Sequence, residues 1–371
     1  MYLYPVYKPY FPKGSLQYAH DALDSTWVSS QGIYLDRAKE KLQEMLGISH
    51  VILTNNGTSS NHLIAKSLKF KYPYIKDVLV PNSVYVAAWN TFLFNGSSHY
   101  MRHLDVDKET WNMDLDEFSK VYYNAQAIMI VHNLGNIINV PELMEKYHQL
   151  VFVEDNCEGF GGEYNGFPSG TKSLCSSLSF YGNKNITSGE GGAFITNDND
   201  VYEYANVVSR QGEDQSRKFI HKMLGYNYRM TNVQAAILLG QLDLWPEIQE
   251  RKWNVFYNYK KFLSNVDNIY FQKEENGTKH SNWIVGIRFS NNPDYETARE
   301  FFNPRGIETR PFFYPIGKHN HLRGFWGHSD VANKLSKEII IFPSYPELTK
   351  ENISYITTAI KEYRKRLDEL Q

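Results

Sequence analysis

The sequence has very little cysteine, no excess of basic residues and no long apolar run. Its 371 residues include only Cys157 and Cys175, which are too few for a disulfide framework and wrongly spaced for a zinc site with neighbouring histidines. The formal net charge of −2 argues against a nucleic-acid binder. No stretch approaches the roughly 18 to 20 apolar residues that span a bilayer. These absences predict a cytoplasmic protein that contacts neither nucleic acid nor a membrane and holds no metal.

Two glycine motifs of nucleotide-binding proteins are also missing. No Gly-x-Gly-x-x-Gly follows an early strand, which argues against a nicotinamide-dependent oxidoreductase. Segment 55–60 contains a glycine but lacks the lysine of a P-loop. What is present is a large apolar fraction, 42% of the residues, which can fill the cores of two or three domains. We therefore expect a globular protein with a small ligand.

Short apolar runs alternate with helical stretches along the first half of the chain. This alternation predicts an α/β domain with a mostly parallel sheet covered by helices. The expected strands are residues 51–54, 78–81, 127–131, 150–154, 178–181 and 193–196. Ligands of such sheets bind at the carboxyl ends of the strands. The polar segments that follow these runs are therefore the places to search for a site.

Near residue 233 the pattern changes to a long helix, which we expect to reach about residue 266 with a break or kink at Pro246. A large domain over residues 1–240 and a smaller C-terminal α+β domain over residues 241–371 are the predicted division. The expected elements of the second domain are strands at 283–289 and 339–342 and helices at 295–302 and 350–367.

Lys184 carries more chemical information than any other residue, because it stands in a glycine-flanked turn between the apolar runs 177–181 and 193–195. A desolvated lysine amine can shed its proton and attack a carbonyl, which is how lysines hold pyridoxal phosphate (PLP) as a Schiff base. A solvated surface lysine is the alternative that the local sequence leaves open.

Two further segments place useful groups after expected strands. In the first, Gly57 lets a ligand approach the backbone and Thr58 adds a hydroxyl at a helix start, which makes an anion cradle or an ordinary helix cap. In the second, strand alternation sends Glu154 and Asp155 to opposite faces, so only one of them readily points into a crevice. Asp155 could keep the cofactor's pyridine nitrogen protonated, or it could cap the next helix.

The connection 211–232 is long for a compact domain, and loops of this length are usually functional or disordered. Its aromatic residues argue against disorder. His221 and Arg229 lie in this connection as candidate contacts, with salt bridging and helix capping as the alternatives.

With these pieces in order, the sequence resembles the sugar aminotransferases of the DegT/DnrJ/EryC1/StrS family, which have the aspartate-aminotransferase-like fold of type I PLP enzymes. The resemblance runs nearly from end to end. Within the family, Glu158 and segments 225–232 and 308–315 are similar to the members that form GDP-perosamine. The matching family motifs are residues 25–32, 56–58, 110–113, 179–184, 189–192 and 225–232.

The resemblance implies three catalytic residues. Lys184 would form the Schiff base and later move the proton, Asp155 would pair with the pyridine nitrogen, and Glu158 would lie near the reacting centre. The amino donor would be L-glutamate, and PLP would alternate with its amine form, pyridoxamine phosphate (PMP). The acceptor would be a nucleotide-linked keto sugar, in the perosamine-like case a 4-keto-6-deoxyhexose used in O-antigen or polysaccharide biosynthesis.

The resemblance also implies the contacts of the cofactor and the substrates. Tyr85 would stack on one face of the cofactor, with Cys157 beneath the other face. The family assembles homodimers with shared sites, in which Asn227 reaches the phosphate from the partner. The other implied phosphate contacts are Gly57, Thr58 and Ser179. The candidate substrate contacts are His221, Arg229, Arg310 and Tyr314. The sequence departs from the family's pattern at Gly317, His319 and His321, so the family's sugar contacts do not carry over there. A shifted loop could bring His319 or His321 to the acceptor, and solvated loop histidines are the alternative.

Two other functions remain open at this point. A PMP-dependent nucleotide-sugar dehydratase on the same scaffold would carry a histidine in place of Lys184. A catalytically silent binding protein would be expected to lose Lys184 or Asp155, and this sequence retains both.

Overall fold

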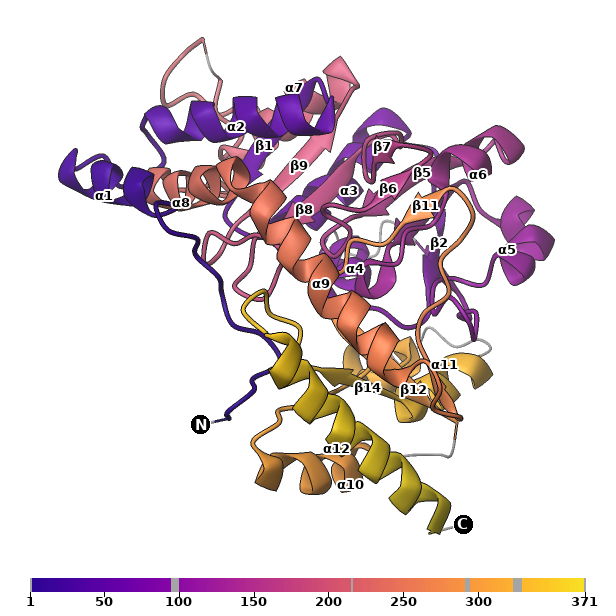
Figure 1. Cartoon of the computed structure of the whole chain (residues 1–371). Helices are drawn as coiled ribbons and strands as arrows, with labels where there is room; N and C mark the ends of the chain where they lie inside the picture. Colours follow the sequence, from indigo (N-terminus) through magenta and orange to yellow (C-terminus); the bar gives the residue numbers. More distant parts are fainter. Residues whose placement is uncertain (1, 95–99, 215, 291–293, 323–328, 370–371) are drawn as a thin grey trace.

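The computed structural model describes residues 2–94, 100–214, 216–290, 294–322 and 329–369. Its main feature is a seven-stranded sheet with the strand order β1-β9-β8-β5-β4-β2-β3 (Figure 1). Within this sheet only β9 runs antiparallel to its neighbours. The mostly parallel sheet expected from the sequence is therefore confirmed. The strands are β1 His50–Thr54, β2 Asp77–Pro81, β3 Tyr100–Leu104, β4 Ala127–Val131, β5 Val151–Asp155, β8 Ser176–Ser179 and β9 Gly192–Thr196.

Six of these seven strands coincide with apolar runs that predict a strand from the sequence, but β3 does not. β3 lies at the edge of the sheet, and its sequence contains the polar residues Arg102 and His103. Arg102 Nε donates a hydrogen bond of 2.7 Å to Asp77 on the neighbouring strand β2. An edge strand with polar side chains lacks the apolar signal on which the expectation rested.

Helices cover both faces of the large sheet, because alternate strand residues send apolar side chains to opposite sides. On one face, α3, α4 and α7 enclose a core that includes Val80 and Met129. On the other face, α2 and α8 pack over β1 and β9, while α5 and α6 cover Ile128 and Ile130. The helices are α1 Gln17–Asp24, α2 Ile33–Leu46, α3 Gly57–Lys71, α4 Ala87–Leu93, α5 Leu115–Val121, α6 Val140–Lys146, α7 Asn199–Ser209 and α8 Asn232–Asp243.

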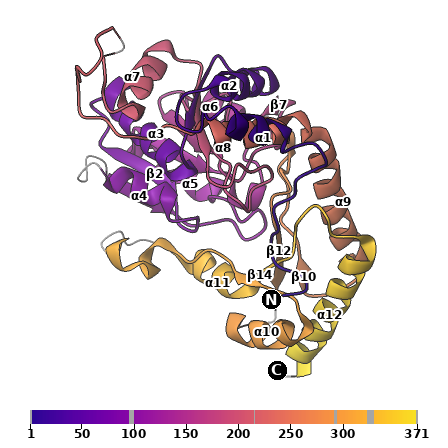
Figure 2. The same ribbon diagram turned by 90° about the vertical axis from the view of Figure 1, so that its left-hand side faces the viewer.

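The helical stretch expected over about 233–266 is two helices that meet at Leu244. α8 ends at Asp243 and α9 Trp245–Leu263 follows, with Pro246 in its first turn, where a proline lacks no intrahelical hydrogen bond. α9 runs away from the large sheet and packs lengthwise against α12 Lys350–Glu369 (Figures 1 and 2). The division of the chain at residue 240 stays a prediction.

A second, antiparallel sheet has the strand order β10-β12-β14-β13 and packs against α9, α10 and α12. A small three-stranded sheet, β11-β6-β7, lies beside the large one. The remaining strands are β6 Glu163–Tyr164, β7 Phe167–Pro168, β10 Ile269–Tyr270, β11 Thr278–Lys279, β12 Val285–Phe289, β13 Arg310–Pro311 and β14 Ile339–Phe342. The remaining α-helices are α10 Tyr295–Phe302 and α11 Asp330–Glu338. Short 3-10 helices cover Tyr122–Asn124, Asn133–Gly135, Asn303–Arg305, Ile316–Lys318 and Asn320–Leu322.

Residues 4–6 form hydrogen bonds with the segment just before β13 of the second sheet. The backbone N–H of Tyr4 donates to the carbonyl of Gly306 at 2.8 Å, and the N–H of Glu308 donates to the carbonyl of Tyr4 at 2.9 Å. The N–H of Val6 donates to Glu308 Oε2 at 2.7 Å. No helix within the described ranges is long and apolar enough to cross a membrane.

Candidate active site

A cavity of about 510 Å³ opens at the carboxyl ends of β5 and β8. Asp155 ends β5, Ser179 ends β8, and both line the cavity together with the first residues of α3. The opposite wall comes from Trp283 and Ile284, just before β12, and from Arg310 in β13. The cavity therefore lies between the two sheets, at the edge where the sequence places its polar segments.

Lys184 occupies the turn between β8 and β9 and points into this cavity. Its backbone N–H donates to the carbonyl of Tyr181 at 2.9 Å, which holds the turn. The side chain is only 13% exposed, and its Nζ lies 3.8 Å from Glu158 Oε1. The same Nζ lies 3.8 Å from the centroid of the Trp283 ring. Lys184 is thus a largely desolvated amine between one carboxyl group and one aromatic face.

Glu158 lies three residues beyond β5 and is buried. Its Oε2 accepts a hydrogen bond of 2.8 Å from the backbone N–H of Leu134. Burial raises the pKa of Glu158 from 4.5 to about 7; the charge of Lys184 opposes this rise and that of Asp155 adds to it. A carboxyl group with this pKa exchanges its proton near neutral pH, directly beside the amine.

Asp155 is buried and is held through both carboxylate oxygens. Oδ2 accepts a hydrogen bond of 2.7 Å from Asn61 Nδ2, and Oδ1 accepts one of 3.1 Å from the backbone N–H of Cys157. Ser177 Oγ donates to Asn61 Oδ1 at 2.7 Å and so fixes the amide of Asn61. In the part of the chain that the structure describes, no lysine or arginine forms an ion pair with Asp155. A buried carboxylate without a counter-ion is suited to a cationic ligand.

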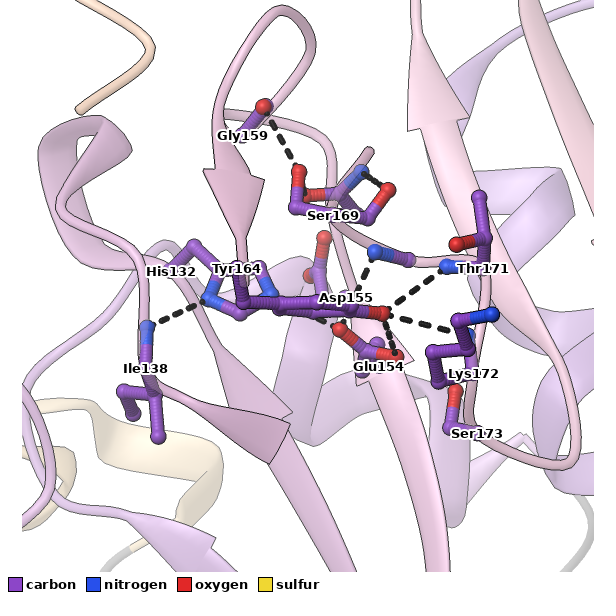
Figure 3. Close-up of polar contacts among 12 residues, drawn as sticks. His132, Ile138, Glu154, Asp155, Gly159, Tyr164, Ser169, Thr171, Lys172 and Ser173 are labelled. Carbon is purple, nitrogen blue, oxygen red and sulfur yellow. Dashed lines mark hydrogen bonds and ion pairs between the residues drawn. The ribbon is translucent and has the colours of Figure 1, made fainter. Parts of the chain in front are cut away.

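Glu154 points to the other face of β5, away from the cavity, as strand alternation predicts (Figure 3). Its Oε2 lies 2.8 Å from Nε2 of the buried His132, and Tyr164 donates its hydroxyl to Oε1 at 3.4 Å. The backbone N–H of Ile138 donates to His132 Nδ1 at 3.1 Å, so the ring proton stands on Nε2 and points at Glu154. This network fixes β5 and leaves Asp155 as the carboxylate of this strand that faces the cavity.

The helix α3 begins at Gly57, on the cavity wall. Asn56 caps the helix, with its Oδ1 accepting a hydrogen bond of 2.9 Å from the N–H of Ser59. A Cβ atom added at Gly57 would lie 2.8 Å from Ser179 Cβ and 3.0 Å from Cys157 Sγ. The helix start therefore packs too closely against Ser179 and Cys157 for any side chain at this position, and Thr58 lines the cavity beside Gly57. The start of a long helix with free N–H groups is a binding site for an anion.

The flanks of the cavity carry Tyr85 and Cys157. Tyr85 is 59% exposed, and its ring lies 6.2 Å from that of Phe313. Burial raises the pKa of the Cys157 thiol well above its usual value, and its Sγ lies 3.5 Å from Ser177 Oγ. Cys157 is thus a small, neutral wall rather than a reactive thiolate.

The donor set fits PLP, and this fit rests on the geometry of the chain itself. An amine that can bond to an aldehyde, a buried carboxylate without a protein counter-ion and a glycine-lined helix start face one cavity. These groups match the aldehyde, the pyridine nitrogen and the phosphate of PLP. No group of three or more potential metal ligands occurs among the described residues.

Several residues named from the sequence lie outside the cavity of this chain. Asn227 Oδ1 accepts a hydrogen bond of 2.9 Å from Arg229 Nε, and His221 Nδ1 lies 3.0 Å from the carbonyl of Gln211. Tyr314 is half-exposed and does not line the cavity. Their roles stay predictions, and for Asn227 the expected route to the cofactor is from a partner subunit.

Arg310 lines the cavity, unlike the histidines that follow it in the chain. Its Nη2 lies 3.2 Å from Glu308 Oε1, and its guanidinium carbon lies 5.0 Å from the centroid of the Tyr7 ring. His321 instead contacts Asn90 Oδ1 at 2.7 Å, and neither it nor His319 reaches the cavity wall. Acceptor contacts from His319 or His321 therefore stay a prediction.

Among the lining residues that sequence reasoning did not name as candidates, Asn61, Trp283 and Glu190 carry functional groups. Asn61 lies on α3 one turn after Gly57, and this helical spacing was the signal that could have predicted it. Trp283 comes from the other side of the molecule, and nothing in its neighbourhood in the sequence points to Lys184. Glu190 lies in the glycine-rich stretch after the lysine, and burial raises its pKa.

The fold and the site define a type I PLP enzyme. A family model described as the DegT/DnrJ/EryC1/StrS aminotransferase family matches residues 11–361, and the chain belongs to this family. It is 33% identical to the GDP-perosamine synthase of Escherichia coli O157:H7 and 32% identical to that of Vibrio cholerae; each alignment covers 97% of this chain and 98% of the relative. Among solved structures, the fold is similar to that of Helicobacter pylori PseC, an aminotransferase involved in the biosynthesis of pseudoaminic acid. That likeness has a TM-score of 0.89 at 22% identity and covers 98% of this chain and 99% of the other.

Proposed function

We propose that this protein uses PLP to transfer the amino group of L-glutamate to a nucleotide-linked 4-keto-6-deoxyhexose. The observation that carries the proposal is the convergence of Lys184 and Asp155 on one cavity at the sheet edge. Bound PLP supplies an aldehyde that carries the amino group and a ring that accepts the electrons released with a proton. The chain's own residues position the reactants and move that proton.

Lys184 is the proposed base and acid, because its largely desolvated amine faces the cavity that would hold the cofactor. Asp155, fixed by Asn61 and the N–H of Cys157, keeps a proton on the ring nitrogen. Glu158 has a pKa of about 7 and lies 3.8 Å from Lys184 Nζ, so it can exchange a proton with the amine or with a substrate oxygen. Gly57 and Ser179 hold the phosphate, together with Thr58.

The proposed acceptor is supported by the names of the relatives. Three relatives at 30–33% identity are called GDP-perosamine synthases, and they are matched over 94–98% of their length. Perosamine is an aminated deoxy sugar, so a GDP-linked keto sugar is the proposed acceptor for this chain. Arg310 and Tyr314 are the proposed contacts on the side of the cavity mouth, with His221 and Arg229 contributed by a partner.

We also propose a homodimer with shared sites. Asn227 and Arg229 lie outside the cavity of their own chain, and the nearby segment exposes Phe219 at 85% and Leu224 at 79%. A group of large, exposed apolar side chains marks a surface that binds a partner. The cytoplasm stays the proposed location, because both Cys157 and Cys175 are unpaired thiols.

Spectra and products test the proposal together. Purified protein with PLP is expected to absorb visible light, to lose this band on addition of L-glutamate, and to release 2-oxoglutarate. Lys184→Ala is expected to lose the band and the amino transfer. A panel of GDP-, UDP- and dTDP-linked 4-keto and 3-keto sugars identifies the acceptor by mass spectrometry of the product. Loss of a hydroxyl without gain of an amine would instead indicate the dehydratase, and full transamination by Lys184→Ala would refute the role of the lysine.

A further inference from the structure

We propose that Trp283 is a positioning residue that keeps Lys184 at the wall of the cavity whenever the amine is not bonded to the cofactor, and that the buried Lys252 holds Trp283 in place. This inference rests on the proposed function of Lys184. It concerns Trp283 and Lys252, which belong neither to the sequence motifs nor to the proposed cofactor contacts.

The indole of Trp283 contacts both the amine and the main chain of the lysine turn. Lys184 Nζ lies 3.8 Å from the ring centroid, a distance at which the π face attracts an ammonium group. The ring Nε1 donates a hydrogen bond of 2.8 Å to the carbonyl of Asn183, the residue before Lys184. The ring is therefore fixed relative to the turn from which the lysine extends, and Trp283 is itself buried.

Lys252 holds the backbone of Trp283 from the opposite side. It extends from α9, is buried, and donates to the carbonyls of Trp283 at 2.6 Å and Ser344 at 2.5 Å. Ser344 Oγ in turn accepts a hydrogen bond of 2.8 Å from the N–H of Val285, so the segment before β12 and the segment after β14 are joined through this amine. Among the described residues no carboxylate pairs with Lys252. The polar contacts of this buried lysine are therefore its hydrogen bonds to the carbonyls of Trp283 and Ser344.

The arrangement matters because Lys184 would be released from the cofactor in the first half of a transamination and would bond to it again only at the end of the second half. A lysine side chain has four rotatable bonds, and the cavity of about 510 Å³ leaves it room to move away. The Trp283 face and Glu158 each lie 3.8 Å from the amine nitrogen and define one resting position. A side chain held there stays within the cavity and forms the bond to the cofactor aldehyde more often.

The experiment measures how fast full-length protein, stripped of cofactor, captures added PLP. Stopped-flow absorbance gives the rate constant for the visible band, and borohydride trapping with peptide mass spectrometry locates the bond on Lys184. Trp283→Leu is expected to slow capture about fivefold, and Trp283→Phe, which keeps a ring but lacks the N–H, about twofold. Lys252→Met, which cannot donate to either carbonyl, is expected to slow capture about twofold by loosening Trp283.

The matched control is Trp253→Leu. Trp253 lies on the exposed side of α9, where Lys279 Nζ is 4.3 Å from its ring centroid, so it forms a comparable pair that does not line the cavity. This variant is expected to capture PLP at the wild-type rate. A wild-type rate in Trp283→Leu, or equal rates in the Leu and Phe variants, would overturn the positioning role. If the Leu variant does not fold, an unchanged rate in Trp283→Phe overturns it. A wild-type protein that forms no band with PLP would instead refute the proposed function.

Discussion

Replacing Glu158 by glutamine should change how the stability of the protein depends on pH. Glu158 is buried beside Lys184, and burial raises its pKa from 4.5 to about 7. Below pH 4.5 the carboxyl group is protonated in both the folded and the unfolded chain. Between pH 4.5 and 7 the unfolded chain releases this proton while the folded chain keeps it, so the contribution of Glu158 to stability falls as pH rises. Above pH 7 the loss is complete.

The size of this loss follows from the change in pKa. A shift from 4.5 to about 7 corresponds to about 3 kcal/mol of unfolding free energy. Glutamine is neutral at every pH in this range, and its amide oxygen can still accept the 2.8 Å hydrogen bond from the N–H of Leu134. The free energy of unfolding of Glu158→Gln, relative to wild type, should therefore rise by about 3 kcal/mol from pH 4.5 to pH 7.5.

Urea unfolding of the cofactor-free protein at half-unit steps of pH measures this difference. Glu40→Gln is the control, since Glu40 is exposed on α2 and its replacement removes one carboxylate without changing the cavity. The control curve should parallel wild type within about 0.5 kcal/mol. A constant difference between Glu158→Gln and wild type over this range would refute the reasoning, because it would mean that burial does not retain the proton.

Three further substitutions test two residues of the cavity wall and one proposed contact from a partner subunit. Gly57→Ala should lower the stability of the protein by about 1–3 kcal/mol in thermal unfolding, because the new Cβ lies 2.8 Å from Ser179 Cβ; unchanged stability would contradict this close packing. Tyr85→Ala should weaken PLP binding about fivefold in a spectroscopic titration, while Tyr85→Phe should bind normally, and equal affinities in the two variants would count against ring stacking. Asn227→Ala should release PLP more readily if subunits share sites, whereas a fully active monomer in light scattering would exclude sharing.

The sheet could be predicted from the sequence because most of its strands are buried on both faces and read as continuous apolar runs. The same reasoning placed Lys184 in a turn after such a run, and it sent Glu154 and Asp155 to opposite faces. It failed for β3, whose edge position tolerates Arg102. It also failed for strands of only two residues, such as β10 and β13, which have no periodicity to detect.

Half of the candidate site depends on contacts that no local pattern encodes. Trp283 lies 3.8 Å from Lys184 although about a hundred residues separate them in the chain. The pKa of Glu158 depends on burial by the whole fold, whereas the sequence shows only an acid after a strand. Asn227 lies outside the cavity of its own chain, and only the family resemblance suggests that it reaches the cofactor of a partner subunit. Local chemistry could be predicted, but the second wall of the cavity could not.

The N-terminal segment has a consequence for how the protein is made. Tyr4 and Val6 form hydrogen bonds with Gly306 and Glu308, which are synthesised about three hundred residues later. These hydrogen bonds can form only after residues 306–308 have been synthesised, so segment 4–6 stays without its native partners while the large sheet is being made.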